Sequence, residues 1–500
     1  MVSPPHDTPL TRLKPGVNES PRPYFLCKAA HASRPSAFGN SSARGYKHFA
    51  PPALRDSMYS LMQLRLAARE IFEEALRTVD AGKAVHQAIR IEGSRIAIRN
   101  ITVDIGRRKI YSIALGKAAA RMGAAIDDAL GERFTSGVIT SNAASLSQIK
   151  LSSRWQQFHG GHPQPNDQSL AAAAASFDLL DRANEEHALL IFLVSGGGSA
   201  MIEWPISQEI SLADLRTANK VLVNCGASIS EINSVRRAFS AVKGGRLAER
   251  APNSDQITLI VSDVPEGEER NVASGPTVAP PPNAPDPRQV IARYDLHSKL
   301  PVTIVRAIET AQPINLTTGA MREHFVLLSN ADALKAAADA AHQRGFITEL
   351  APEISDQPID RGCDLLIKRL EALRAKHRRR DGVVCVISGG EFACPVRGNG
   401  IGGRNLETAL RLARSPNFSS PETVALCAGT DGIDGNSPAA GAIVDSTTRD
   451  RANKIGLDAE DFLQRSDSYS YFVALGDVVA TGATGANVRD IRILVAEADR

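Results

Sequence analysis

The strongest constraint on the fold is a buried-strand pattern that occurs several times along the chain. Continuous apolar runs, such as Ala188 to Val194, are followed at once by glycines or by an acidic side chain. A strand that is apolar on both faces is typical of a parallel sheet covered by helices. Stretches with helical apolar spacing lie between these runs. The pattern therefore predicts an α/β protein with ligand-binding groups at the carboxyl ends of its strands.

Length and charge narrow the class of protein. At 500 residues, 43% of them hydrophobic, the chain is long enough for two domains with separate cores. A net charge of +3 gives no electrostatic reason to expect a nucleic-acid or membrane partner. The six cysteines are scattered without a CxxC motif, which is typical of reduced thiols. We expect a soluble, cytoplasmic protein, and a homo-oligomer is left open.

The first 57 residues differ in composition from the rest. They contain 9 of the 28 prolines and few acidic residues, which is typical of a segment that cannot order itself. A disordered extension over residues 1–57 is the prediction. A transit peptide and a start codon assigned too far upstream, with the true start at Met58, are the alternatives.

Two α/β domains are predicted for the remainder, each a mostly parallel sheet flanked by helices. The N-terminal domain, residues 58–300, should be doubly wound and Rossmann-like, and the C-terminal domain should span residues 301–500. Between residues 301 and 380 the chain is rich in helical pattern. Its two short apolar runs, HFVLLS and FITELA, favour a place in the C-terminal sheet.

Two candidate anion-binding groups lie in the N-terminal half. Lys117 follows a strand and Gly116 at the opening of a helix, where backbone amides already favour an anion. The turn after the run at 188–194 reads Ser195-Gly196-Gly197-Gly198-Ser199. Consecutive backbone amides in such a turn form a nest for phosphate oxygens. The alternatives are an ordinary surface lysine and a flexible loop.

A second candidate anion site lies in the C-terminal half. Another buried strand runs into Gly389, Gly390 and Glu391, and a glycine cluster at 398–403 then leads to Arg404 at the start of a helix. Glycine permits close approach of the backbone to a ligand. Backbone amides, a carboxylate and a guanidinium together suit a phosphorylated or carboxylated ligand.

Acidic side chains recur where predicted strands end. Asp263, Glu391, Asp431 and Asp434 all have this placement. Mg²⁺ takes oxygen ligands and often bridges substrate phosphates, so these acids predict a magnesium site. A single Asp-Gly turn would be an ordinary turn without a function. Three strands that each end in an acidic residue are less common in one sheet protein.

Basic and imidazole side chains give weaker signals. The helical stretch at 233–250 contains Arg237 and Lys243, which could hold a substrate anion or could belong to a solvated basic face. His159 and His162 lie three residues apart in a proline-containing segment with no third ligand nearby. They predict a shaped loop near the site and not a metal centre.

Known nucleotide-binding motifs are mostly excluded. The chain has no GxxxxGK[ST] sequence and no protein-kinase signature. GNGIGG at 398–403 matches the dinucleotide fingerprint, but a proline precedes it and the acid about 20 residues on, Glu422, lies before the next strand. A nicotinamide-dependent dehydrogenase is therefore an alternative function, and a catalytically silent sensor of a phosphorylated metabolite is a third.

A series of motifs in fixed order resembles the glycerate 2-kinase family, whose C-terminal part is the MOFRL domain, here residues 381–500. The resemblance runs from about residue 60 to the C-terminus and rests on LGKAA (115–119), GHPQPND (161–167), VSGGGSA (194–200), NSVRRAFSAVKGGRLA (233–248), SDVPEG (262–267), SGP (274–276), ISGGE (387–391), GGRNLE (402–407), GTDGIDG (429–435) and TGATGANVRD (481–490). Two motifs depart from the family pattern. Family members commonly have SDVPGDD where this chain has SDVPEGEE, and TGPTGTNVND where it has TGATGANVRD. These differences affect the expected geometry of the two loops more than the expected chemistry.

The resemblance implies ATP-dependent, Mg²⁺-assisted phosphorylation of D-glycerate to 2-phosphoglycerate in an interdomain cleft. It also implies functional roles for Lys117 and Arg404. Similar sequences have often carried the label hydroxypyruvate reductase, so an NAD(P)H-dependent hydroxypyruvate reductase is the alternative function. Combined with the residue patterns, the resemblance predicts that Lys117 and Arg404 neutralise the transferred group. We assign Asp263 to catalysis, and Arg237 and Lys243 to the substrate carboxylate. The predicted metal ligands are Glu391, Asp431 and Asp434, and the predicted nucleotide-binding residues are Ser195, Gly196, Gly197, Gly198, Ser199, Gly389, Gly390, Gly402 and Gly403.

Overall fold

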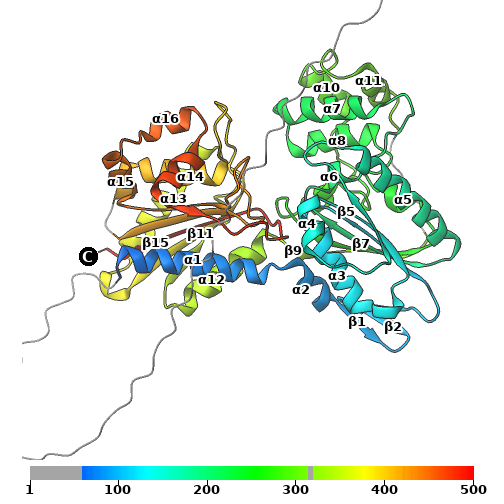
Figure 1. Cartoon of the computed structure of the whole chain (residues 1–500), viewed down its shortest axis with the longest axis horizontal. Coiled ribbons are helices and arrows are strands. Elements are labelled where there is room, and N and C mark those ends of the chain that lie inside the picture. Colours follow the sequence, from blue (N-terminus) through cyan, green and yellow to red (C-terminus); the bar gives the residue numbers. More distant parts are fainter. Residues whose placement is uncertain (1–58, 313–318, 420–421, 500) are drawn as a thin grey trace, which may run out of the picture. The chain divides into compact units, whose positions relative to one another are not determined.

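The structure of the protein is a computed structural model that describes residues 59–312, 319–419 and 422–499. The predicted disordered extension over residues 1–57 lies outside the described residues. The described chain forms two six-stranded sheets and one three-stranded sheet, with helices packed against them (Figure 1). The predicted α/β class is confirmed.

The first sheet has the strand order of a doubly wound fold. Its order is β6-β5-β4-β7-β8-β9, and every pair is parallel. Numbered within the sheet, this is 3-2-1-4-5-6, the dinucleotide-fold order. The order reverses between β4 and β7, so the loops after these two strands lie at the topological switch point. The strands are β4 (Ile110–Leu115), β5 (Ser136–Ser141), β6 (Trp155–His159), β7 (Leu189–Ser195), β8 (Asp255–Val261) and β9 (Arg322–Leu328).

Strand β7 shows why the first sheet is covered on both faces. All seven of its residues are buried. Leu189, Ile191 and Leu193 pack in one core with helix α3 (Ala119–Leu130). The alternate residues of the strand pack in a second core with helix α5 (Asp167–Glu185). Side chains alternate across a strand, so an unbroken apolar run requires this two-sided cover.

The second sheet is mixed, which corrects the expectation of a mostly parallel sheet. Its order is β10-β11-β15-β12-β13-β14. Only β10 and β11 pair in parallel, because β15 lies antiparallel between β11 and β12, and β13 and β14 continue the antiparallel pairing. The strands are β10 (Ile347–Leu350), β11 (Val383–Gly390), β12 (Thr423–Gly429), β13 (Gly441–Asp445), β14 (Val478–Val479) and β15 (Asp490–Glu497). An apolar run does not encode the direction of its neighbour.

The placement of the run HFVLLS in the C-terminal sheet was wrong. This run belongs to β9, which pairs with β8 and completes the first sheet. The run FITELA contains β10 and does join the second sheet. A long connection separates β8 from β9 in the sequence, so proximity in sequence favoured the wrong partner. The limit between two domains near residue 300 stays a prediction.

The first described helix packs against the second sheet, although it precedes every strand of the first. Helix α1 (Leu61–Thr78) begins at Ser60, which forms a capping box with Gln63. Its apolar face shares a core with β12, β15 and helix α12 (Asn330–Gln343). Arg65 on this helix donates to Asp445 and to Asp477, both at 2.5 Å, and both carboxylates are buried.

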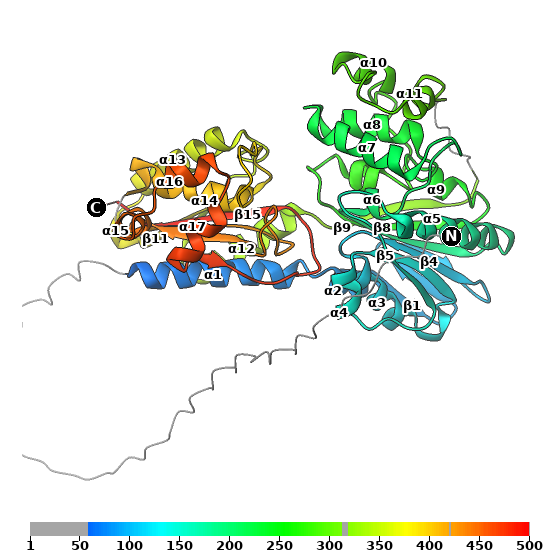
Figure 2. The same ribbon diagram turned by 45° about the horizontal axis from the view of Figure 1, so that its top comes forward.

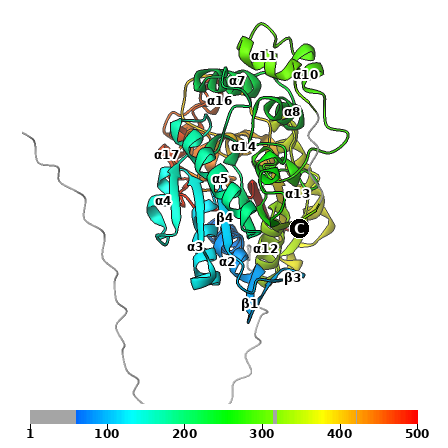
Figure 3. The ribbon, with the colours of Figure 1, turned by 90° about the vertical axis from the view of Figure 1, so that its right-hand side faces the viewer.

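The other elements fall into small groups. Helices α7, α8, α10 and α11 share a separate core, and both turned views show them gathered together (Figures 2 and 3). No described helix combines the length and apolar character needed to cross a membrane. The remaining strands are β1 (Ile89–Glu92), β2 (Arg95–Ile98) and β3 (Ile101–Asp104), and the helices are α2 (Ala81–Ala88), α4 (Ala143–Gln148), α6 (Gly198–Met201), α7 (Leu212–Asn224), α8 (Ile229–Phe239), α9 (Arg246–Glu249), α10 (Pro287–Arg293), α11 (Val302–Glu309), α13 (Ile359–Lys376), α14 (Arg404–Arg414), α15 (Thr448–Lys454), α16 (Ala459–Gln464) and α17 (Ser468–Leu475).

Removal of the Arg65 side chain should destabilise the fold. Arg65→Ala leaves the buried carboxylates of Asp445 and Asp477 with less compensation, and we expect a loss of about 3 kcal/mol in the free energy of unfolding. Arg77→Ala is the matched control, because Arg77 lies on the same helix in exposed ion pairs and its loss should change stability by less than about 0.5 kcal/mol. Urea unfolding measures both, and equal effects would contradict the role of Arg65.

Candidate active site

The loops after β4 and β7 are bonded to each other at the switch point of the first sheet. Gly116 has φ +109, and a Cβ on it would lie 2.4 Å from both the Ser195 carbonyl and the Ser195 hydroxyl. The next residue, Lys117, donates its backbone N–H to the Gly196 carbonyl at 2.8 Å. Glycine is required at position 116 for this close approach. The Ser195 hydroxyl is used inside the fold, between the Leu115 carbonyl and the Ala118 amide.

Lys117 reaches a carboxylate that follows a strand of the second sheet. Its Nζ lies 2.8 Å from Asp431 Oδ2, across 314 positions of sequence. A Cβ on Gly197 would lie 3.2 Å from Lys117 Cγ and 3.0 Å from His162 Cδ2. The structure therefore brings together the predicted lysine, the predicted phosphate nest and one predicted strand-end acid.

Asp263 lies against the same nest. A Cβ on Gly196 would lie 1.9 Å from Asp263 Oδ2, so any other residue at position 196 would displace this carboxylate. Asn487 Nδ2 approaches the same oxygen at 3.5 Å. Burial raises the pKa of Asp263, and the nearby Lys117 opposes that rise. A carboxylate with a raised pKa beside an ammonium group is suited to accept a proton.

His162 lies in the candidate site, although from sequence we predicted only a shaped loop near the site at this position. Its ring lies beside Gly197, next to Lys117. Desolvation of the ring and the charge of Lys117 lower the pKa of His162 to about 4. The imidazole is therefore neutral at pH 7 and can donate or accept a hydrogen bond without adding charge.

Arg404 is held by two carboxylates at the edge of the second sheet. Its Nε donates to Asp490 Oδ2 at 2.6 Å and its Nη2 donates to Asp490 Oδ1 at 3.1 Å. The same Nη2 lies 2.9 Å from Glu391 Oε1. A bidentate pair of this kind fixes the plane of the guanidinium as well as its position.

The charges in this cluster shift one another. Burial raises the pKa of Glu391 to about 7, although Arg404 opposes the rise. Burial would lower the pKa of Arg404, but Asp490 and Glu391 outweigh it and raise that pKa. Asp490 titrates below its ordinary range because Arg404 overcomes the effect of burial. Asp490 therefore stays ionised, and Glu391 is the group in this cluster that can exchange a proton near neutral pH.

Asp490 is a site residue that the search for acids at strand ends missed. It is the first residue of β15, and it pairs in register with Gly390 of β11 and Gly429 of β12. Because β15 runs antiparallel to both neighbours, its beginning lies at the edge where they end. The motif TGANVRD contains this aspartate, but the motif alone does not indicate which of its residues lies in the site.

The predicted nucleotide-binding glycines Gly389 and Gly390 are packed against protein. Both residues are buried, and their carbonyls accept hydrogen bonds from Arg492 at 2.5 and 3.1 Å. A Cβ on Gly389 would lie 2.0 Å from Asn330 Oδ1, and one on Gly390 would lie 2.4 Å from Ser355 Cβ. Close packing inside the fold is sufficient to account for glycine at both positions.

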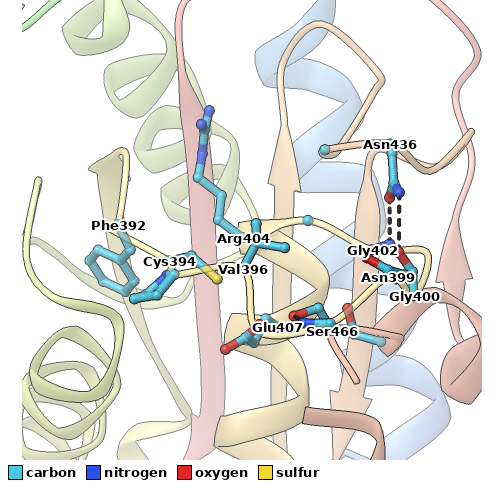
Figure 4. Close-up of a pocket in the computed structure, with 15 residues that line it drawn as sticks. Phe392, Cys394, Val396, Asn399, Gly400, Gly402, Arg404, Glu407, Asn436 and Ser466 are labelled. Carbon is cyan, nitrogen blue, oxygen red and sulfur yellow. Dashed lines mark hydrogen bonds between the residues drawn. The ribbon is translucent and has the colours of Figure 1, made fainter. Parts of the chain in front are cut away.

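A cavity of about 660 Å³ lies beside the glycine loop at 398–403 (Figure 4). Gly402 donates to Asn436 Oδ1 at 2.8 Å, and Asn436 Nδ2 donates to the Gly400 carbonyl at 3.1 Å. The Arg404 side chain points away from this loop (Figure 4). The cavity has the size of a small-molecule site and a mixed polar and apolar lining, which includes Phe392, Cys394, Val396, Gly403 and Ser466.

Asp434 is engaged at the start of helix α14. Its carboxylate accepts hydrogen bonds from the backbone amides of Asn405 at 3.1 Å and Leu406 at 2.8 Å. It is buried, and Gly403 packs directly against it. Among the residues that the structure describes, no three His, Cys, Asp or Glu side chains gather as a metal site. The geometry therefore gives no support for a shared site of Asp434 with Glu391 and Asp431.

The two predicted substrate-binding cations have different surroundings. Lys243 is buried and forms an ion pair with the equally buried Glu203, which leaves its ammonium no contact with a ligand. Arg237 is buried too, and its Nη2 donates to Asn271 Oδ1 at 2.7 Å. Burial lowers the pKa of Arg237 to about 10. No carboxylate of the described residues forms an ion pair with Arg237, so its charge is available to an anion.

Comparisons with known proteins agree over most of the chain. Residues 67–309 match a family described as a domain of unknown function, DUF4147, and residues 384–490 match the MOFRL family. The glycerate 2-kinase of Pyrococcus horikoshii is 33% identical over 450 residues, which cover 88% of this chain and 99% of that relative. A putative hydroxypyruvate reductase of Agrobacterium vitis is 34% identical and covers 86% of this chain and 94% of its own.

A solved structure shows the same fold. The crystal structure of glycerate kinase from Thermotoga maritima is 29% identical and superposes with a TM-score of 0.73. The superposition covers 87% of this chain and all of that one.

The buried carboxyl of Asp434 should make stability depend on pH. Burial raises its pKa to about 7, so the folded state holds a proton that the unfolded chain has released near pH 4. This group therefore lowers stability as the pH rises from about 4 to 7. Asp434→Asn keeps an oxygen acceptor for the helix and removes the titration. Urea unfolding at pH 5 and at pH 8 gives the free energy of unfolding of the variant minus that of the wild type. This difference should be larger at pH 8 by about 1 to 3 kcal/mol. The same difference at both pH values would contradict the raised pKa of Asp434.

Proposed function

The chain belongs to the glycerate kinase family, and from this we propose that it phosphorylates D-glycerate to 2-phosphoglycerate with ATP and Mg²⁺. The observation that supports the proposal most is the pairing of two cations with carboxylates at the edges of the two sheets. Lys117 lies against the glycine nest of the first sheet, and Arg404 is fixed at the edge of the second. Phosphoryl transfer needs such positioned positive charge more than covalent chemistry.

The proposed reaction uses the protein to place charge and accept one proton. The glycerate oxygen forms a bond to the γ-phosphorus of ATP as the bond from that phosphorus to the bridging oxygen breaks and ADP leaves. Lys117 and Arg404 neutralise the negative charge on the transferred group. Asp263 accepts the hydroxyl proton, which its position beside the nest and its raised pKa support.

Magnesium would have to bind with help from the nucleotide. Mg²⁺ is often held by one or two carboxylates together with substrate phosphates and water. The donor set fits that mode and not an all-protein cage, because the described residues contain no group of three ligands. Asp431, beside Lys117, is the carboxylate that we propose for it. When bound, the ion would neutralise phosphate charge and orient the γ-phosphoryl group.

We assign the nucleotide to the cavity beside helix α14. Gly402 and Gly403 line it, together with apolar side chains suited to a purine ring. For the substrate we retain Arg237 as the partner of the carboxylate, and we drop Lys243 because its ammonium is buried against Glu203. A cytoplasmic location stays a prediction.

The rival function is a nicotinamide-dependent hydroxypyruvate reductase, a name that similar sequences carry. Two observations disfavour it. The fingerprint GNGIGG does not follow a strand directly, because β11 ends at Gly390 and a loop of 13 residues precedes α14. Its glycines pack on neighbouring backbone, with a Cβ on Gly398 only 2.6 Å from the Arg465 carbonyl. Protein contacts therefore explain the motif without a pyrophosphate.

Purified protein with D-glycerate, ATP and Mg²⁺ should release ADP, and removal of Mg²⁺ by chelation should abolish the release. The same protein with hydroxypyruvate and NADH or NADPH should oxidise neither cofactor. NAD(P)H oxidation without ADP release would overturn the kinase proposal. Binding of a phosphorylated ligand without either reaction would favour a sensor.

Arg404→Ala should lower kcat by about 10³-fold, as for other arginines that stabilise a transferred phosphoryl group. Arg414→Ala is the matched control, because Arg414 lies on the same helix in an exposed ion pair with Glu460. It should leave kcat within about twofold of the wild type, since exposed pairs contribute little. Nearly full activity in Arg404→Ala would remove this residue from the mechanism.

A further inference from the structure

Three polar side chains connect the glycine nest to helix α8. The Ser199 hydroxyl lies 2.9 Å from the Ser274 hydroxyl, and the Ser274 hydroxyl lies 2.8 Å from Asn233 Oδ1. Ser274 and Asn233 are buried, whereas Ser199 is partly exposed. The chain of hydrogen bonds therefore has one end inside the protein and one end that a ligand can reach.

The direction of the protons in this chain follows from its buried end. Asn233 Oδ1 has no proton, so the Ser274 hydroxyl must donate to it. Ser274 has only that proton, and its oxygen must accept from Ser199. Ser199 consequently donates its only hydroxyl proton to Ser274. Its oxygen can therefore only accept a hydrogen bond from a ligand that binds beside it.

The backbone fixes Ser274 in this arrangement. Ala273 and Ser274 have φ values of +52 and +63, a left-handed conformation that non-glycine residues seldom adopt. The Ser274 carbonyl accepts the Gly244 amide at 3.2 Å, and Ala273 Cβ packs against Gly198 of the nest. Strained backbone that the surrounding contacts enforce is common at binding sites. Here it keeps the Ser274 hydroxyl between Asn233 and Ser199.

The exposed end of the chain belongs to the glycine nest of the candidate active site. Ser199 lies two residues after Gly197, where a Cβ would contact Lys117 and His162. Arg237, one helical turn after Asn233 on α8, donates to the Ser274 carbonyl at 3.5 Å. Ser274 therefore contacts two different groups. Its carbonyl accepts from Arg237, which has no carboxylate partner among the described residues, and its hydroxyl contacts the Ser199 oxygen, which can only accept.

We propose that Ser199 Oγ accepts a hydrogen bond from a hydroxyl of the substrate and thereby selects hydroxy acids. This inference rests on the proposed function, and it differs from the prediction that Ser199 binds phosphate. A phosphate oxygen needs a donor, which Ser199 cannot supply while Ser274 and Asn233 hold its proton. A substrate hydroxyl supplies the missing proton. A keto oxygen at that position has no proton to donate, so its lone pairs and those of the Ser199 oxygen would repel each other.

Binding measurements with acids that lack one hydroxyl test the proposal. Calorimetry without nucleotide compares D-glycerate with D-lactate, which lacks the 3-hydroxyl, and with 3-hydroxypropanoate, which lacks the 2-hydroxyl. Wild-type protein should bind one of the two deoxy acids roughly tenfold more weakly than glycerate, the usual effect of one neutral hydrogen bond. The weaker of the two identifies the hydroxyl that Ser199 accepts.

Ser199→Ala should abolish that discrimination and leave the affinity for ATP unchanged. A loss of ATP affinity instead, or an equal weakening of all three acids, would overturn the proposal. Ser274→Gly adopts the same left-handed backbone without strain and removes the hydroxyl that holds the Ser199 proton, so it should reduce the discrimination at least threefold. Asn233→Asp keeps an acceptor for the Ser274 hydroxyl, so this variant should retain the discrimination. Wild-type discrimination in Ser274→Gly would contradict the proton direction.

Failure of the inference and failure of the kinase proposal give different results. Discrimination among the acids without ADP release would support the hydroxyl contact and reject the kinase reaction. ADP release with no discrimination between glycerate and either deoxy acid would support the reaction and reject the contact. A protein that binds none of the three acids would contradict both.

Discussion

The buried carboxylate of Asp490 is the charge on which the arrangement of the candidate site depends. It accepts two hydrogen bonds from Arg404 and lies 3.7 Å from the guanidinium of Arg492, which is itself fully buried. Arg492 in turn holds the carbonyls of Gly389 and Gly390 at the end of β11. Without this carboxylate two guanidinium groups would lie close together with little compensation, which is strongly destabilising.

The topology of the two sheets explains why functional groups meet at these places. In the first sheet the strand order reverses between β4 and β7, so the loops that carry Lys117 and the glycine nest meet at the switch point, where the Lys117 amide donates to the Gly196 carbonyl. In the second sheet the antiparallel β15 brings Asp490 to the edge where β11 and β12 deliver Glu391 and Asp431. The ion pair of Lys117 with Asp431 joins the two edges.

Much of this could be predicted from sequence, because some patterns have few structural interpretations. A wholly apolar run followed by SGGGS favours a buried strand and a tight turn, and the Rossmann-like order of the first sheet is confirmed. The acids Asp263, Glu391 and Asp431 do follow strands, as predicted. Their chemical roles stay predictions.

The errors have physical causes that sequence does not encode. Strand direction decides which end of a strand reaches the site, so Asp490 at the start of β15 was overlooked. Several glycines were attributed to ligand approach, whereas close packing against Asn330 and Ser355 is sufficient to account for Gly389 and Gly390. Lys243 was assigned to a substrate anion because its buried partner, Glu203, lies 40 residues earlier in the chain and cannot be recognised as a partner from sequence.

The central claim is that Lys117 and Arg404 act on the same phosphoryl group. A double-mutant cycle with Lys117→Met and Arg404→Ala, measured as kcat/KM for ADP release with glycerate, tests it most directly. Residues that act as a unit show strongly non-additive effects, so the double variant should be about as active as the slower single variant. A rate in the double variant that equals the product of the two single effects would contradict the account.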